Sequence, residues 1–200
     1  MSSVVGALRE RYVFPGRTAR LAQFFGELLP HGASVLDVGC GDGTPAVLIK
    51  QRRPDISIEG IDLVPYPDAK IPVEKFDGRH IPRGDKSVDA VIFIDVLHHT
   101  DDPTILLREA KRVARRCVVV KDHRMAQVFA YAILRFMDWV GNAHHGIPLP
   151  YNYWPEERWR RTLAELGFHV EEWLPSLGLY PFPPSLVFDR GLHFIAKLAP

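Results

Sequence analysis

The chain contains the segment Ser34-Val-Leu-Asp37-Val-Gly39-Cys-Gly41-Asp-Gly43, a short apolar run that ends in three glycines at alternate positions. Residues 44–50 then show helical character, with Pro45 in the first turn, where its missing N–H leaves no hydrogen bond unmade. The pattern predicts a strand, a tight turn and a helix. Glycines in such a turn let the backbone approach a ligand without interference from Cβ atoms.

Strands and helices alternate on both sides of this turn. Further strands are predicted at 56–62, 73–77, 88–94, 116–121, 168–174 and 191–198, and further helices at 18–29, 101–113, 124–140 and 155–166. The run 88–94 is almost continuously apolar, as expected for a strand buried on both faces of a parallel sheet. The alternation predicts a doubly wound α/β sheet of about seven strands, mostly parallel with an antiparallel C-terminal strand.

Ligands of such sheets bind at the carboxyl ends of the strands. Asp62 ends the next predicted strand, roughly twenty residues after the glycine turn, where a carboxylate can accept both hydroxyl groups of an adenosine ribose. The glycine turn and Asp62 together predict a nucleoside site. The glycine spacing differs from the G-x-G-x-x-G of dinucleotide enzymes, which disfavours a nicotinamide-dependent oxidoreductase.

The motifs of this chain resemble those of a known family. Residues 35–43 are similar to the first motif of class I S-adenosylmethionine-dependent methyltransferases, of the small-molecule "type 11" branch. The similarity continues in order through residues 59–62, 76–78, 89–99 and 102–113, and covers roughly residues 33–121. The resemblance implies a Rossmann-like methyltransferase fold with S-adenosyl-L-methionine as cofactor.

The resemblance also implies which residues hold that cofactor. They are Asp37, Gly39, Cys40, Gly41, Gly43, Asp62, Leu63, Asp77, Gly78, Ile94 and Asp95. The glycine turn would pack on the methionine part, with Asp37 anchoring its ammonium group and Asp62 holding the ribose. Leu63 would pack on adenine, and Asp77 would accept a hydrogen bond from the adenine amino group. Two alternatives stay open, in which Asp37 only caps the following turn and Asp77 is only a turn residue.

Candidates for a general base follow the fourth and fifth predicted strands. His123 is preferred, because its ordinary pKa near 6.5 lets it accept a proton at cellular pH, with Asp122 orienting the substrate or capping the next helix. His98 is a further candidate, and His144 and His145 are weaker ones. Asp122 and His123 can both reach the site only if the backbone turns into a helix at residue 124. Alternatively, Asp122 only caps that helix and His123 is a surface residue.

A metal is not expected from the sequence. Asp95, His98 and His99 are similar to an E-x-x-E-H cluster that binds a divalent ion in some quinone and RNA methyltransferases, but two of the positions differ. We therefore expect this set to pack beside the cofactor, and activity to survive a chelator. Cys40 is expected to be a small loop residue, since no partner that would activate its thiolate is evident.

Composition limits the partners. Twenty-five Lys and Arg balance 24 Asp and Glu, so no overall field attracts nucleic acid or an anionic membrane. No apolar segment reaches the ~20 residues of a membrane span, and two distant cysteines without an apolar leader predict the reducing cytoplasm.

We expect one domain, with a cofactor-binding half at 33–122, a substrate-side cap or lid at 1–32 and 123–154, and a C-terminal helix and strands at 155–200. The expected activity is methyl transfer to a small-molecule acceptor. The aromatic loop 148–154 would cover a lipophilic or aromatic acceptor, or else is simply fixed by its prolines. A catalytically silent cofactor-binding regulator is the alternative function, and the oligomeric state stays open.

Overall fold

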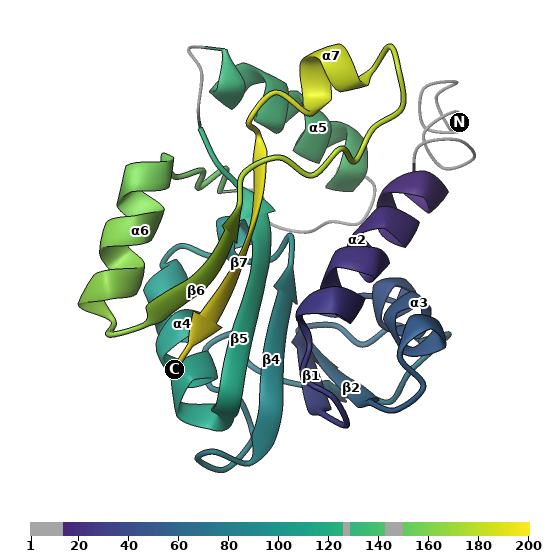
Figure 1. Cartoon of the computed structure of the whole chain (residues 1–200), viewed down its shortest axis with the longest axis vertical. Coiled ribbons are helices and arrows are strands. Elements are labelled where there is room, and N and C mark those ends of the chain that lie inside the picture. Colours follow the sequence, from purple (N-terminus) through teal and green to yellow (C-terminus); the bar gives the residue numbers. More distant parts are fainter. Residues whose placement is uncertain (1–13, 126–128, 143–149) are drawn as a thin grey trace.

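The computed structural model describes residues 14–125, 129–142 and 150–200 (Figure 1). Its centre is a seven-stranded sheet in the order β3-β2-β1-β4-β5-β7-β6. The strands are β1 (Ser34–Val38), β2 (Ser57–Asp62), β3 (Val73–Lys75), β4 (Val88–Ile94), β5 (Ala114–His123), β6 (His169–Leu174) and β7 (His193–Ala199). Strand β7 runs antiparallel to both of its neighbours. The predicted fold class is therefore confirmed, including its antiparallel C-terminal strand.

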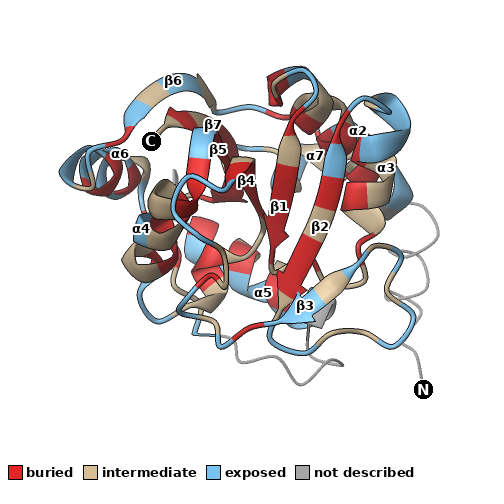
Figure 2. Ribbon diagram, turned by 90° about the horizontal axis from the view of Figure 1, so that it is seen from below, coloured by how far each residue is buried: buried red, intermediate tan, exposed pale blue. Residues whose placement is uncertain are grey.

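Helices cover both faces of the sheet and one of its ends (Figures 1 and 2). Helices α2 (Phe14–Leu28) and α3 (Thr44–Arg52) lie on one face, and α4 (Pro103–Val113) and α6 (Glu156–Glu165) on the other. Helices α5 (Ala130–Asn142) and α7 (Ser185–Phe188) lie beyond the carboxyl ends of β4 and β5. No helix of the described ranges is long and apolar enough to cross a membrane.

The core has two halves because successive residues of a strand point to opposite faces of the sheet. In β1, Val35 packs in the cluster with α2 and α3, whereas Leu36 packs in the cluster with α4 and α6. Figure 2 shows the central strands almost entirely buried between these helices. This burial explains why the sequence of β4 is continuously apolar.

The prediction for the end of β5 is wrong. The strand continues through His123 instead of ending at Lys121, and the next helix begins at Ala130 rather than at Arg124. The reason is pairing with β7, which satisfies the backbone as far as His123, after which Arg124 donates its N–H to the carbonyl of Leu192. Asp122 and His123 are consequently both strand residues.

Candidate functional site

The glycine turn after β1 is held tightly against neighbouring elements. Gly39 and Gly43 have φ of 72° and 76°, a region that side chains other than glycine rarely adopt. A Cβ atom at Gly39 would lie 2.7 Å from Cγ2 of Val96, which follows β4, and one at Gly43 would lie 2.6 Å from Cγ1 of Ile71. Both glycines are therefore required by backbone conformation and by close packing.

Asp37 is an unusual buried acid. It is 1% exposed within β1, and none of the described residues donates a hydrogen bond to its carboxylate. Burial raises the pKa of Asp37 to about 7, and the neighbouring carboxylate of Asp62 adds to this. A turn-capping role, the alternative open at the sequence level, is not observed. A buried carboxylate that receives no hydrogen bond from the described residues fits a site for the ammonium group of the cofactor.

Asp62 and the adenosine-side residues lie next to the turn. Asp62 Oδ2 accepts a hydrogen bond from Gly41 N at 2.8 Å, so the carboxylate also fixes the turn. Leu63 is half exposed beside Gly78, where a Cβ atom would lie 2.8 Å from Leu63 Cδ2. Asp77 Oδ1 accepts hydrogen bonds from the N–H groups of the two residues at 79 and 80, which is the geometry of a turn residue.

Cys40 has the packing role expected of it. The residue is buried, and its Sγ occupies the place that a Cβ atom at Gly60 on β2 would need. Burial raises the pKa of the Cys40 thiol far above its ordinary value, and nearby carboxylates add to this. A reactive thiolate is therefore disfavoured at this position.

Asp95, which follows β4, is held by two cations. Its carboxylate forms ion pairs with Arg17 of α2 and with Lys121, which is fully buried in β5. Burial would raise the pKa of Asp95, but these two cations outweigh it and hold the pKa well below its usual range. Asp95 and His98 therefore do not face one another as joint metal ligands would. Asp95 contacts two cations, whereas His98 contacts the carboxylates of Asp122 and Asp138.

Asp122 positions His98 and caps no helix, which corrects one of the alternatives above. Its Oδ1 lies 2.7 Å from His98 Nδ1 and 2.6 Å from His123 N, and its Oδ2 accepts from Leu97 N at 2.9 Å. The carboxylate is fully buried, and its acceptors are used by these donors. His98 lies in the 3₁₀ turn η2 (Leu97–His99), so the end of β5 fixes the residues that follow β4.

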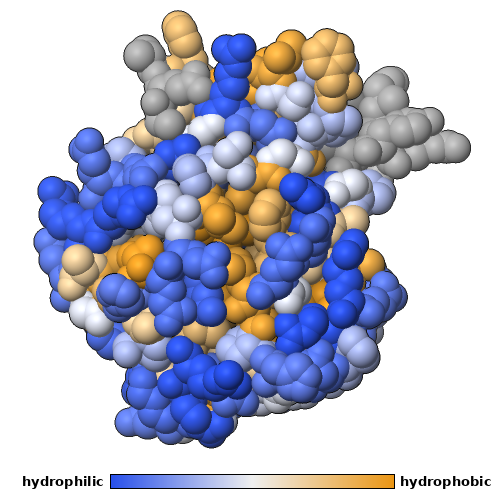
Figure 3. Space-filling model, viewed as in Figure 1, coloured by the Kyte–Doolittle hydropathy of each residue, from blue (hydrophilic) through white to orange (hydrophobic). Residues whose placement is uncertain are grey.

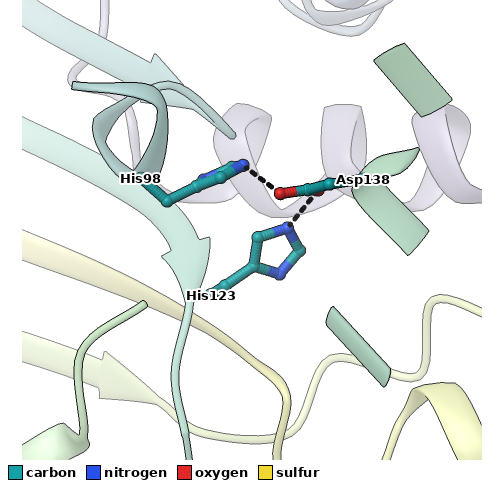
Figure 4. Close-up of side chains that lie close together, drawn as sticks. All are labelled: His98, His123 and Asp138. Carbon is teal, nitrogen blue, oxygen red and sulfur yellow. Dashed lines mark ion pairs between the residues drawn. The ribbon is translucent and has the colours of Figure 1, made fainter. Parts of the chain in front are cut away.

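His123 is buried and not on the surface, contrary to the other alternative. It is 4% exposed, and its Nδ1 lies 3.1 Å from Nδ1 of His193. Its Nε2 faces α5, where Asp138 Oδ1 is 3.7 Å away, and His98 Nε2 lies 3.4 Å from Asp138 Oδ2 (Figure 4). Tyr153 donates its hydroxyl hydrogen to Asp138. We call His98, His123, Asp122, Asp138 and Tyr153 the histidine–carboxylate cluster.

Electrostatics differ between the two histidines. Burial alone would lower the pKa of His98, but Asp122 and Asp138 outweigh it and raise the pKa to about 10. Burial lowers the pKa of His123 well below its ordinary value, and the positive charges of His98 and Lys121 lower it further. Two histidines whose rings are 4.5 Å apart thus prefer different protonation states.

Sequence reasoning missed four residues of this site, namely Arg17, Lys121, Asp138 and Tyr153. Lys121 and Asp138 carried a usable signal, because each is a charged residue inside an apolar strand or helix. Arg17 had no such signal. His144 and His145, the weaker base candidates, lie outside the described residues.

Helix α5 also presents apolar side chains outward. Phe136 and Trp139 are more than half exposed, and Figure 3 shows apolar side chains at the end of the molecule where α5 and α7 lie. A shallow groove of about 330 Å³ is lined by Ala132, Arg135, Phe136, Trp139 and Tyr151. This groove lies on the same helix as Asp138.

Comparison with known proteins supports the assignment of the fold. Residues 9–172 match the model of a methyltransferase domain family. A 27-O-demethylrifamycin SV methyltransferase of Amycolatopsis mediterranei is 30% identical over 113 residues, which span 49% of this chain and 41% of that protein. The chain thus matches less than half of that relative's length.

Two solved structures have the same fold. A SAM-dependent methyltransferase from Aquifex aeolicus superposes with a TM-score of 0.62 at 19% identity, covering 98% of both chains. Geranyl diphosphate C-methyltransferase from Streptomyces coelicolor, solved with Mg²⁺, geranyl diphosphate and S-adenosyl-L-homocysteine, gives 0.67 at 14% identity over 89% of this chain and 78% of that one.

The chain belongs to the methyltransferase domain family, since the family model covers most of its length. Its cofactor is S-adenosyl-L-methionine. The glycine turn, the buried Asp37 and Asp62 at the end of β2 fit that cofactor, which brings a cationic amino acid and a ribose and no phosphate.

Proposed function

We propose that the protein transfers the methyl group of S-adenosylmethionine to a small-molecule acceptor. One observation carries the proposal: the histidine–carboxylate cluster lies directly beyond the strands that follow the cofactor turn, and Val96, two residues before His98, packs on Gly39 of that turn. A protein that only bound the cofactor would have no need of buried imidazole nitrogens beside it.

The bound cofactor supplies an electrophilic methyl group on a sulfonium sulfur. The residues of the chain would bind and orient the two reactants and keep water out, because charge is neutralised in the transition state and positioning supplies much of the acceleration. Asp37 would hold the ammonium group and Asp62 the ribose, with the other cofactor residues as assigned by resemblance. Asp122 acts as a positioning residue for His98.

His98 and His123 are proposed as the groups that face the acceptor. Each has its Nε2 atom within 3.7 Å of an oxygen of Asp138, and in this proposal either nitrogen contacts an acceptor oxygen or nitrogen, directly or through a bound ion. The ring centroid of Tyr153 lies 5.7 Å from that of His98 and 6.3 Å from that of Tyr151, and these aromatic rings favour a lipophilic or aromatic acceptor. Residues 33–122 would then be the cofactor-binding half and residues 123–154, with 1–32, the acceptor side.

A cytoplasmic location is part of this proposal. The two cysteines, Cys40 and Cys117, are both free and buried, which fits a reducing compartment. The near balance of charges gives no reason to propose a nucleic-acid partner.

The test is a methyl-transfer screen. Purified protein is incubated with S-adenosylmethionine labelled at the methyl carbon and with fractionated small-molecule extract, and labelled products are separated by chromatography. We expect label in one small-molecule fraction and its absence with the Asp62→Ala variant. Cofactor binding by calorimetry together with no labelled product in any fraction would favour the silent regulator instead.

A further inference from the structure

We propose that His98 Nε2, His123 Nε2 and a carboxylate oxygen of Asp138 form a three-ligand site for a divalent first-row transition-metal ion such as Zn²⁺. The three atoms lie within 4.8 Å of one another, and all three residues are buried (Figure 4). This set differs from Asp95, His98 and His99, which the sequence brought to attention. It replaces the expectation that activity survives a chelator.

The proton on His98 is placed by Asp122. The carboxylate of Asp122 accepts from His98 Nδ1 at 2.7 Å and is otherwise occupied by backbone N–H donors. His98 Nδ1 therefore carries hydrogen, so the hydrogen that Nε2 carries in the charged ring is the one that a metal ion would replace. That nitrogen is buried and has no hydrogen-bond partner in the described part of the chain. A carboxylate that holds the far nitrogen of an imidazole is the usual outer partner of a metal-binding histidine.

The proton on His123 is placed by Lys121 and His193. Lys121 Nζ has only hydrogens to offer and lies 3.4 Å from His193 Nδ1, so that nitrogen is an acceptor. We assign His123 Nδ1, 3.1 Å from the same atom, as its donor. His123 Nε2 is left as a lone pair that lies between two carboxylates, 3.7 Å from Asp138 Oδ1 and 3.6 Å from Asp95 Oδ1.

Asp138 is the third ligand of the proposed site, because an ionised carboxylate has lone pairs to offer and no hydrogen. Its carboxylate is fixed by the hydroxyl group of Tyr153 and lies 3.4 Å from His98 Nε2. The carboxylates of Asp122 and Asp138 flank the two nitrogens of His98 at 2.7 and 3.4 Å, so negative charge surrounds the place where the ion would bind. Ligand atoms at about 2.0–2.1 Å from a tetrahedral zinc ion lie roughly 3.3 Å apart, so separations of up to 4.8 Å would have to contract by as much as about 1.5 Å to hold the ion.

The donor set selects the class of ion. Two imidazoles and one carboxylate suit zinc and its first-row neighbours, whereas Mg²⁺ prefers oxygen ligands. Three protein ligands leave a fourth position open, as in catalytic zinc sites. In a role that depends on the proposed function, this position would take the acceptor oxygen, so the acceptor would carry a hydroxyl group. That hydroxyl loses its proton to bulk solvent as the acceptor binds, the oxygen then forms a bond to the methyl carbon, and the carbon–sulfur bond breaks to leave S-adenosylhomocysteine.

Metal binding is measured without reference to activity. The protein is prepared without a histidine tag, stripped with a chelator, and titrated with Zn²⁺ against a chromogenic chelator and with Co²⁺ by visible absorption. We expect one ion per chain and the absorption of a low-coordinate Co²⁺ site. Asp138→Asn should weaken Zn²⁺ binding by at least about 100-fold, and Tyr153→Phe, which removes only the partner of a ligand, by about 10–100-fold.

His99→Gln is the matched control, because His99 lies in the same 3₁₀ turn and is not one of the three ligands. Its Zn²⁺ affinity should stay within about threefold of wild type, and circular dichroism establishes that each variant is folded. Absence of stoichiometric binding, or equal losses in His99→Gln and Asp138→Asn, would overturn the site. Calorimetry with S-adenosylmethionine on the same samples separates the two proposals, since failure of the ion alone leaves cofactor binding and methyl transfer in place.

Discussion

Replacing Asp37 by asparagine tests the cofactor site through folding stability as well as through binding. In the unfolded chain Asp37 has its ordinary pKa of 3.8, whereas burial in β1 raises the pKa to about 7. Between these values the folded protein keeps a proton that the unfolded chain has lost, so stability falls as the pH rises from about 4 to about 7 and then levels off. The difference of about 3 in pKa corresponds to about 4 kcal/mol.

The amide side chain of the Asp37→Asn variant carries no charge and has nearly the same shape as the carboxyl group. This variant should therefore gain stability relative to wild type as the pH rises, by up to about 4 kcal/mol between pH 4 and pH 8. Urea denaturation at several pH values measures this gain. The matched control is Asp68→Asn, at an exposed acid, whose stability should follow that of wild type throughout.

Cofactor binding should change in the opposite direction. The ammonium group of S-adenosylmethionine pairs with the ionised carboxylate, so wild-type affinity should rise between about pH 6 and about pH 8. Asp37→Asn should lose about 1.5–3 kcal/mol of binding free energy at pH 8 and most of the pH dependence. Parallel stability profiles for the variant and wild type, together with unchanged affinity in calorimetry, would refute the assignment of Asp37.

The other predictions concern ribose binding, the acceptor side and packing. Asp62→Ala should weaken S-adenosylmethionine binding by roughly 2–4 kcal/mol in calorimetry, because two charge-assisted hydrogen bonds are lost, and unchanged affinity in a folded variant would contradict the cofactor site. His123→Ala should lower turnover roughly 100-fold or more with cofactor affinity intact, and normal turnover on the identified acceptor would remove His123 from the site. Gly60→Ala should destabilise the protein by about 1–3 kcal/mol in urea denaturation, since its Cβ atom would collide with Cys40 Sγ. Adding Cys40→Ala should recover part of that loss, and a double variant no more stable than Gly60→Ala would contradict the packing argument.

Local patterns in the sequence were sufficient for the cofactor half. The glycines of residues 39–43 have a backbone conformation that favours glycine, and Asp62 ends the next strand along the chain. By contrast, the packing of Val96 and Ile71 on Gly39 and Gly43 comes from distant residues. The continuously apolar sequence of β4 predicts a strand that is buried on both faces of the sheet. Each of these signals lies within a short segment of the sequence. The fold class and the order of its elements could therefore be predicted.

The acceptor side depended on contacts that no local pattern encodes. The strand β5 reaches His123 only because β7, some 70 residues later in the chain, pairs with it there. Asp138 joins His98 and His123 because α5 lies across the carboxyl ends of the strands, and Arg17 reaches Asp95 from a helix that precedes the whole sheet. The sequence predicted a nucleoside site from the glycine turn and Asp62, which are close in the chain, and its resemblance to a family implied the cofactor. The tertiary structure alone decided which carboxylate each histidine faces, because those pairs are set by how distant elements pack.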